Sequence, residues 1–349
     1  MARTGVLLTA FGGPDRLDSV APFMCSIMGA EPTDEMLSEA RRKYLTIGGF
    51  SPLPAMAERI AAQLERVLGG LPLAEVTDDD GGALGLWGGA MASLRAQENV
   101  RIPVVVGMLH CEPSIARAVS LLVGSGVRQI VAVSLSPFEA AATTGAYREA
   151  LEAALKEHPG VRLIEAASYH RDEQFVGWYA EHLNEAMRDA DVLAHKGIVI
   201  FTAHSLPVSD VATDPAYVDQ LRETATAVAA SAGLGKPTGF DSLPGLEAFG
   251  GPGLTAPWLL AFQSKGRRGG EWLGPDLDDV IAAAVAAVYA VVIVVPIGFA
   301  VDHMETLYDL DVRAADPVFS ADREFVRVPV LNAAPPFIEV LADAVRKVL

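Results

Sequence analysis

Residues 197–207 read Gly-Ile-Val-Ile-Phe-Thr-Ala-His-Ser-Leu-Pro, an uncharged run that leads directly into polar side chains. The run is rich in β-branched and aromatic residues, which are enriched in strands. A short apolar run that ends at Pro is typical of a fully buried strand. We therefore predict a buried strand over Gly197–Thr202, with an imidazole just beyond its end.

Outward from this stretch, apolar runs of similar length alternate with longer amphipathic stretches, which is typical of βαβ units and a parallel sheet. The expected strands are Gly5–Ala10, Ile102–Met108, Gln129–Leu135, Arg162–Ala166, Gly197–Thr202, Trp258–Gln263 and Val291–Ile297. The expected helices are Pro54–Leu68, Pro113–Val123, Ala142–Leu155, Asp172–Met187, Pro215–Ala232, Asp276–Tyr289 and Pro336–Val348. The predicted fold class is α/β.

The composition excludes several classes of protein. With 51% hydrophobic and 20% charged residues, the chain can bury a large core and is not intrinsically disordered. A net charge of −17 provides no basic footprint, so we expect no nucleic-acid partner. Two cysteines, Cys25 and Cys111, are too few for a four-cysteine metal or iron–sulfur site. No secretory signal is recognisable at the N-terminus, and we expect a cytoplasmic protein.

Residues 280–300 carry no charge and have the length of a membrane span. Their first half is rich in alanine, a good helix former, and their second half is β-branched up to Pro296. Acidic residues flank the stretch, and no Lys or Arg lies at its edges to orient a span. We predict a helix that leads into a buried strand and no transmembrane segment, although peripheral membrane contact is left open.

Polar side chains follow two of the expected strands. His204 follows the first, and Asp302, His303 and Glu305 follow the strand at 291–297. Ligands in open α/β sheets bind beyond the carboxyl ends of strands. Imidazole and carboxylate together suit proton transfer or binding of a divalent first-row metal. Phe11-Gly12-Gly13-Pro14 lacks both glycine-rich phosphate-binding motifs, so a nucleotide site is not indicated.

With these motifs in place, the chain resembles the ferrochelatases, enzymes that insert Fe²⁺ into a porphyrin. The resemblance is closest to the coproporphyrin ferrochelatases of Gram-positive bacteria. The matching segments are Phe11-Gly12-Gly13-Pro14, residues 44–53 (Tyr-Leu-Thr-Ile-Gly-Gly-Phe-Ser-Pro-Leu), residues 143–147 (Thr-Thr-Gly-Ala-Tyr), residues 203–207 (Ala-His-Ser-Leu-Pro), Phe262-Gln263-Ser264, residues 272–275 (Trp-Leu-Gly-Pro) and residues 296–305.

The resemblance implies two Rossmann-like domains, each a parallel sheet flanked by helices, with the active-site cleft between them. The first domain is expected over residues 1–160 and the second over 161–324. The C-terminal segment, 325–349, is expected to pack on the first domain. Two long Gly-rich loops, 69–99 and 235–256, lie outside the resemblance.

The resemblance also implies the site residues. His204 and Glu305 are expected to be the catalytic residues and to bind the metal, and no iron–sulfur cluster or other cofactor is expected beyond the substrate iron. The implied porphyrin contacts are Phe11, Lys43, Tyr44, Ser51 and Tyr147. Tyr44 and Tyr147 have an alternative interpretation as core aromatics.

Two departures from the family pattern bear on the substrate. Phe11 stands where coproporphyrin enzymes usually have a tyrosine, and Met28 where an arginine is expected. We favour coproporphyrin III and keep protoporphyrin IX as the alternative. Two other functions stay open: a chelatase for another divalent metal or tetrapyrrole, and a non-catalytic porphyrin- or haem-binding protein. The sequence indicates no oligomeric state.

Overall fold

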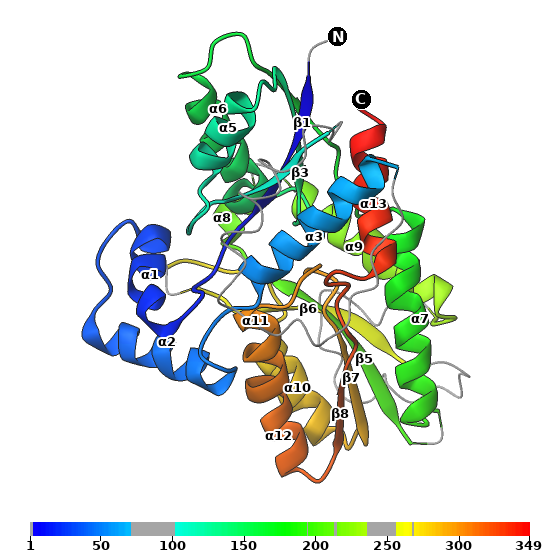
Figure 1. The fold of residues 1–349 in the computed structure, drawn as a ribbon. Helices are drawn as coiled ribbons and strands as arrows, with labels where there is room; N and C mark the ends of the chain where they lie inside the picture. The colour runs from blue at the N-terminus through cyan, green and yellow to red at the C-terminus, as the bar shows by residue number, and fades with distance from the viewer. Residues whose placement is uncertain (1–2, 71–101, 194, 213–214, 236–255, 267–268) are drawn as a thin grey trace. The chain divides into compact units, whose positions relative to one another are not determined.

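A computed structural model describes residues 3–70, 102–193, 195–212, 215–235, 256–266 and 269–349 (Figure 1). The chain forms two compact units. Unit 1 comprises residues 1–169 together with 332–349, and unit 2 comprises residues 170–331. The predicted loops 69–99 and 235–256 lie almost entirely outside the described residues.

Unit 1 is built on a parallel four-stranded sheet of order β2-β1-β3-β4. The strands are β1 (Thr4–Ala10), β2 (Val104–Met108), β3 (Gln129–Ser134) and β4 (Arg162–Glu165). Figure 1 shows α5 (Ile115–Gly124) and α6 (Ala146–Leu155) on one side of this sheet, and α3 (Leu53–Leu68) with α13 (Pro335–Arg346) on the other. Helices on both faces explain why the central strand β1 is apolar without alternation.

Unit 2 repeats this design with the sheet order β6-β5-β7-β8, again all parallel. Its strands are β5 (Gly197–His204), β6 (Trp258–Gln263), β7 (Val291–Val295) and β8 (Glu324–Arg327). The helices pack in two pairs, α7 (Glu173–Asp189) with α9 (Ala216–Ser231), and α10 (Leu277–Ala286) with α12 (Ala315–Ser320). The two core strands β5 and β7 are buried along nearly their whole length.

Shorter elements lie between these main ones. Residues 17–46 form η1 (Leu17–Ser19), α1 (Val20–Met28) and α2 (Asp34–Thr46). Short helices α8 (Val208–Val211) and α11 (Met304–Leu307) follow β5 and β7, and π-helical turns η2 (Ala141–Gly145) and η4 (Asp309–Ala314) precede α6 and α12. The Thr33 side chain caps α2 by accepting a hydrogen bond from the Met36 amide.

The two units share a residue-level correspondence. Ala10 pairs with Met108 at the end of β1, and Ala203 pairs with Phe262 near the end of β5. The amide of Met108 then bonds to the Pro113 carbonyl just before α5, and the amide of Phe262 bonds to the Pro275 carbonyl just before α10. The two units are therefore similar to each other, as the family resemblance implies, although no internal repeat is evident in the sequence itself.

The equivalence between the two units also holds for the next residue of each central strand, after Ala10 and Ala203. Phe11 and His204 follow the equivalent alanines, and Leu109 and Gln263 follow the equivalent residues of the neighbouring strands. The amide of Leu109 bonds to the Ala10 carbonyl, so this part of β2 still runs beside β1. Phe11 in unit 1 thus corresponds to His204 in unit 2, and Leu109 corresponds to Gln263.

The structure confirms every predicted strand to within two residues at each end and confirms the α/β class. It moves the predicted domain boundaries at 160/161 and 324/325 to 169/170 and 331/332. β4 belongs to unit 1 because it pairs with β3, and β8 belongs to unit 2 because it pairs with β7. The end of the chain joins unit 1 through the contact of α13 with α3.

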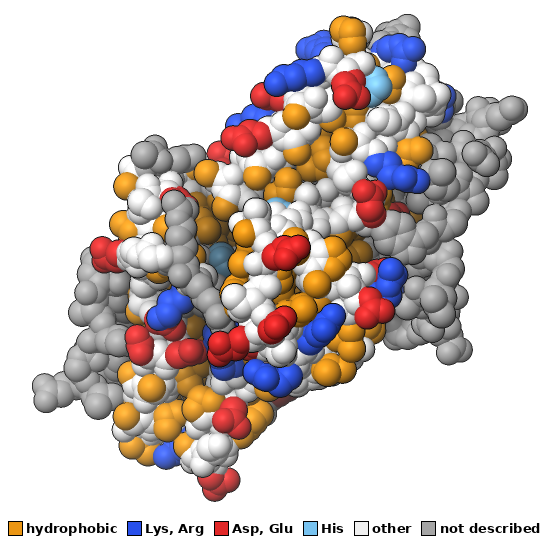
Figure 2. Space-filling model, turned by 90° about the vertical axis from the view of Figure 1, so that its left-hand side faces the viewer, with side chains coloured by type: hydrophobic (Ala, Val, Ile, Leu, Met, Phe, Trp, Pro, Cys, Tyr) orange, Lys and Arg blue, Asp and Glu red, His pale blue; other side chains and the backbone are white. Residues whose placement is uncertain are grey.

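The uncharged stretch at 280–300 divides between α10, the strand β7 and the turn that follows, as its composition predicts. Within the described residues, no helix has both the length and the apolar character needed to cross a bilayer. Figure 2 shows acidic and basic side chains interspersed over the face that it draws, without a continuous basic patch among the described residues. This pattern agrees with the absence of a basic footprint in the sequence.

Candidate functional site

His204 is the last residue of β5, the central strand of the second sheet. The residue before it, Ala203, is fully buried, so the strand emerges from the core at the imidazole. The Tyr217 hydroxyl on α9 donates a hydrogen bond of 2.8 Å to the His204 carbonyl. His204 therefore lies at the carboxyl edge of a parallel sheet. Its backbone is held by pairing with β6 and by the hydrogen bond from α9.

Glu305 reaches the same edge from β7 through a turn that passes very close to β5. The Gly298 amide bonds to the Thr202 carbonyl at 3.0 Å, and a Cβ at position 298 would lie only 2.6 Å from the Cα of Ala203. Only glycine permits so close an approach. The turn is also fixed by the Tyr179 hydroxyl, which donates to the Phe299 carbonyl. After it, α11 begins and presents Glu305.

The two predicted catalytic side chains meet. His204 Nδ1 lies 3.0 Å from Glu305 Oε2, although 101 residues separate them in the chain. His303 Nε2 lies 3.6 Å from the same carboxylate oxygen. The side chains of His204 and Glu305 are 33% and 24% exposed, so each retains surface that a ligand can touch. Within the described residues, no group of three or more His, Cys, Asp or Glu side chains is arranged to hold a metal ion.

The pair is electrostatically coupled. Burial works to lower the pKa of His204, but the charge of Glu305, its hydrogen bond and the charge of Asp309 together raise that pKa above its usual value. Burial works to raise the pKa of Glu305, yet His204 and His303 hold it well below its usual range. Glu305 is therefore ionised at physiological pH, and His204 holds its proton to a higher pH than a free imidazole would.

Asp302 of the same run serves the local structure. Its Oδ1 accepts hydrogen bonds from the Thr306 hydroxyl at 2.8 Å and from the Arg327 guanidinium at 3.3 Å. Arg327 also forms a bidentate ion pair with Asp311, in which Nε and Nη2 donate to the two carboxylate oxygens. Of the acidic residues after β7, Asp302 orients the loop, whereas Glu305 faces His204.

Phe11 is half-buried at the end of β1. Its ring packs edge-to-face against His110, with ring centroids 4.5 Å apart, and against Phe23 of α1 at 6.3 Å. The Ser26 hydroxyl lies 2.9 Å from His110 Nδ1. Phe11 is therefore a half-buried member of an aromatic cluster in unit 1.

The other four predicted porphyrin contacts also belong to unit 1. Ser51 is buried, and its amide bonds to the Pro14 carbonyl, so it supports the loop that follows Phe11. Tyr44 and Tyr147 are each only 4% exposed, which fits their alternative interpretation as core aromatics. Lys43 is half-buried and forms an ion pair of 3.3 Å with Glu39, one turn earlier in α2.

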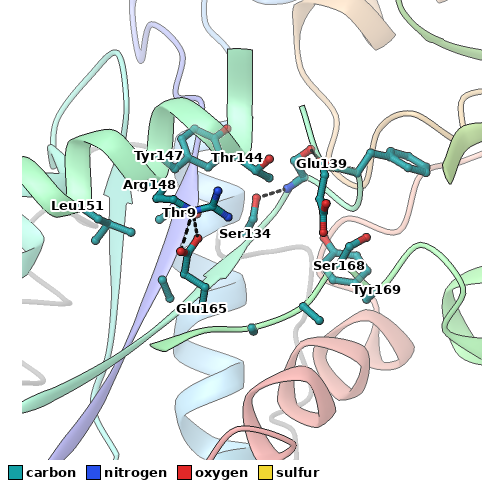
Figure 3. Close-up of a pocket in the computed structure, with 15 residues that line it drawn as sticks. Thr9, Ser134, Glu139, Thr144, Tyr147, Arg148, Leu151, Glu165, Ser168 and Tyr169 are labelled. Carbon is teal, nitrogen blue, oxygen red and sulfur yellow. Dashed lines mark hydrogen bonds and ion pairs between the residues drawn. The ribbon is translucent and has the colours of Figure 1, made fainter. Parts of the chain in front are cut away.

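Tyr147 also lines a pocket of about 230 Å³ at the carboxyl ends of β3 and β4 (Figure 3). In this pocket Arg148 faces Glu165, and its Nε donates to both carboxylate oxygens, at 2.7 and 2.9 Å. Burial raises the pKa of Tyr147 above its usual value, so its hydroxyl is neutral. Glu165 balances the charge of Arg148, and Glu139 also lines the pocket, so the lining has no net positive charge that would select an anionic group.

Three residues that contact the backbone around the pair were not predicted to have roles at the site: Tyr179, Tyr217 and Gln263, whose Nε2 donates to the Glu305 carbonyl. Gln263 lies in a segment, Phe262-Gln263-Ser264, that contributes to the family resemblance. The two tyrosines lie inside expected helices and carry no motif of their own. Only the fold shows that their hydroxyls reach backbone carbonyls at the ends of β5 and β7.

Comparison with known proteins identifies the family to which this chain belongs. A model of the family described as ferrochelatase matches residues 3–349. The chain belongs to the ferrochelatase family. Ferrochelatases insert a metal ion into a porphyrin. A ferrochelatase of Deinococcus radiodurans is 29% identical over 98% of this chain and 95% of its own length. Coproporphyrin III ferrochelatases of a Geobacillus species and of Listeria monocytogenes are each 26% identical, over 97% of their own length.

Solved structures show the same fold at low sequence identity. The SirB protein of Bacillus subtilis with Fe³⁺ aligns over 99% of this chain and 95% of its own, with a TM-score of 0.51 and 14% identity. The sirohydrochlorin chelatase SirB of Bacillus subtilis subspecies spizizenii, in complex with cobalt, has a TM-score of 0.51 and 12% identity. These likenesses support the two-unit architecture and nothing finer.

Proposed function

We propose that this ferrochelatase inserts Fe²⁺ into coproporphyrin III, with protoporphyrin IX as the alternative substrate, and that His204 and Glu305 carry the metal and the pyrrole protons. The observation that supports these roles is the 3.0 Å contact between two partly exposed side chains at the carboxyl edge of a sheet. Family membership gives the reaction class, and the contact supports our proposal that these two residues carry it out.

His204 is proposed as the base. Insertion must remove two protons from pyrrole nitrogens, and a neutral imidazole is the usual acceptor near neutral pH. His204 accepts one proton, releases it to solvent, and is then neutral again to accept the second. Because Nδ1 faces Glu305, Nε2 is the nitrogen that remains for the substrate, and within the described residues it has no hydrogen-bond partner. The carboxylate fixes the orientation of the ring, as a second group does for many catalytic histidines.

Glu305 is proposed to hold the incoming iron and to stabilise the imidazolium that forms. Its low pKa keeps it anionic, and a carboxylate with an imidazole is a suitable ligand set for a divalent first-row metal. Glu305 and His204 as two protein ligands would leave coordination positions open for pyrrole nitrogens, and His204 must release the ion before its Nε2 accepts a proton. Binding of Fe²⁺ at the carboxylate would partly cancel its charge, and this would lower the pKa of His204 at the stage when the base must be neutral.

The choice of coproporphyrin III is supported by the names of several relatives. Its four carboxylates need cations on a protein of net charge −17. The α2 helix supplies exposed Arg41 and Arg42 beside half-buried Lys43, whereas Met28 at the end of α1 is 41% exposed and uncharged. We propose Lys43 as a propionate contact, together with Phe11, Tyr44, Ser51 and Tyr147 as porphyrin contacts. We further propose that no resident cofactor takes part.

The test is insertion without oxygen by the purified full chain. Fe²⁺ is added with coproporphyrin III or, separately, with protoporphyrin IX, and the optical spectrum follows loss of the free-base porphyrin. Co²⁺ and Ni²⁺ form parallel arms. We expect iron insertion into coproporphyrin III at the higher kcat/KM. Faster turnover of protoporphyrin IX would overturn the choice of porphyrin, and binding without any insertion would support a carrier instead.

A further inference from the structure

Gln263 is a buried amide that touches both halves of the candidate site. It is the last residue of β6, is 1% exposed, and pairs in register with His204 of β5. Its Nε2 donates a hydrogen bond of 2.8 Å to the Glu305 carbonyl. One side chain thus connects the strand beside His204 to the backbone of Glu305, which lies 42 residues further along the chain.

The next residue makes a parallel contact. The Ser264 hydroxyl donates a hydrogen bond to Asp309 Oδ2, and Asp309 is itself buried in η4. Ser264 adopts a φ of +59°, a left-handed conformation that is uncommon for any residue with a side chain. Consecutive residues at the end of β6 therefore hold the segment 305–309 at both its ends.

Unit 1 shows what the same fold does without this contact. Leu109 takes the position of Gln263, just as Phe11 takes the position of His204. Leu109 packs, partly buried, against the apolar core of unit 1. The strand end therefore accepts an apolar side chain, and the fold itself does not require an amide at this position.

The amide is also costly where it lies. Gln263 Oε1 is buried and has no hydrogen-bond partner among the described residues. A buried polar atom without a partner costs stability, and an apolar residue of similar size avoids that cost. A stability role would predict a fully satisfied amide or an apolar residue. Gln263 instead has an Oε1 without a partner among the described residues and an Nε2 that donates to the Glu305 carbonyl.

We propose that Gln263 is a positioning residue that sets the Glu305 carboxylate against the His204 imidazole. The proposal rests on the proposed function, since it assigns Gln263 to the work of that pair. Loss of the Nε2 contact frees the Glu305 backbone, and the carboxylate then leaves hydrogen-bonding distance of Nδ1. The porphyrin need not touch Gln263, so its binding is unaffected.

Gln263→Leu is the decisive variant because it installs the residue that unit 1 carries. Gln263→Met, which keeps the length of the side chain, is the second variant in case leucine fits poorly. Gln63→Leu is the matched control, since Gln63 is a buried glutamine on α3 of unit 1. For Gln263→Leu we expect kcat to fall about ten-fold or more, porphyrin KM to stay within about two-fold, and Tm to stay level or rise.

A double-mutant cycle tests whether Gln263 acts through Glu305. In the Glu305→Gln background, Gln263→Leu should reduce kcat by less than about two-fold, because the carboxylate that it positions is already gone. A crystal structure of Gln263→Leu should show Nδ1 and Oε2 separated beyond hydrogen-bonding distance. Independent losses that multiply in the cycle, or an unchanged pair distance with near wild-type kcat, would overturn the proposal.

Different results would exclude the proposed function and the positioning role of Gln263. A wild-type protein that inserts metal into neither porphyrin would remove the proposed function, and the positioning role with it. A wild-type protein that turns over normally while Gln263→Leu matches Gln63→Leu in kcat would remove the positioning role alone.

Discussion

Phe11 and His204 occupy the same position in the two sheets of this protein. Each residue follows an alanine of the central strand that pairs with the neighbouring strand, Ala10 with Met108 and Ala203 with Phe262. One sheet therefore ends in an imidazole and the other in a phenyl ring. Acid–base chemistry at these equivalent positions is restricted to unit 2, whereas unit 1 offers a surface for stacking and dispersion.

Glu305→Gln should change how the rate depends on pH. In the wild-type protein, Glu305 raises the pKa of His204, so the neutral base appears only at a pH above its usual value. Glutamine keeps the shape and removes the charge, so burial then dominates and lowers that pKa. We expect the rising limb of kcat/KM against pH to move to lower pH, with a maximal kcat that falls by more than KM changes. A limb that stays in place or moves upward would show that His204 is not the titrating base.

Phe11→Tyr tests whether the end of β1 faces the macrocycle. Phe11 is half-buried, so an added hydroxyl can reach solvent, and the change in unfolding free energy should stay within about 0.5 kcal/mol. A phenol in front of the iron would ligate it, so we expect an altered haem spectrum of the product complex and slower product release. Phe23→Tyr, on the neighbouring ring of the same cluster, is the control.

The outcome separates two positions for Phe11. An unchanged product spectrum together with a lowered Tm would mean that the hydroxyl is buried away from the substrate. That result would remove Phe11 from the proposed porphyrin contacts.

Lys43→Gln should weaken the binding of coproporphyrin III and reduce its dependence on salt. The lysine is paired with Glu39, so glutamine is a cleaner change than a glutamate, which would place two like charges one helical turn apart. A partly exposed contact between Lys43 and a propionate is screened by salt, so wild-type affinity should fall as salt is added. Lys156→Gln, at an exposed position of unit 1, is the control. Equal affinities and equal salt slopes in the two variants would contradict a propionate contact.

The sequence predicted the central strands well because their signal is strong and local. Gly197–Thr202 and Val291–Ile297 are uncharged, mostly β-branched runs, and both form buried strands. It missed β8, whose four residues begin and end with a charge and are half-exposed. It also missed α2, on which only Tyr44 is buried, because one buried residue makes no apolar stripe.

The site was predicted in part for the same reason. His204 follows a strand that can be recognised, so its place at the edge of the sheet follows from the pattern. Its contact with Glu305 depends on a turn that the sequence marks only by Gly298 and on a register between strands far apart in the chain. The role of Gln263 needed both the register of β6 and the comparison with Leu109 of the other unit.

The central claim is that His204 removes the pyrrole protons during iron insertion. Its most direct test compares wild-type protein and His204→Ala in one assay without oxygen, with Fe²⁺ and coproporphyrin III, and with porphyrin binding measured by fluorescence in the same samples. His195→Ala, an exposed histidine of unit 2, is the control. We predict that His204→Ala binds porphyrin within about three-fold of wild type and inserts iron about 100-fold more slowly or not at all. Near wild-type insertion by His204→Ala would contradict the account.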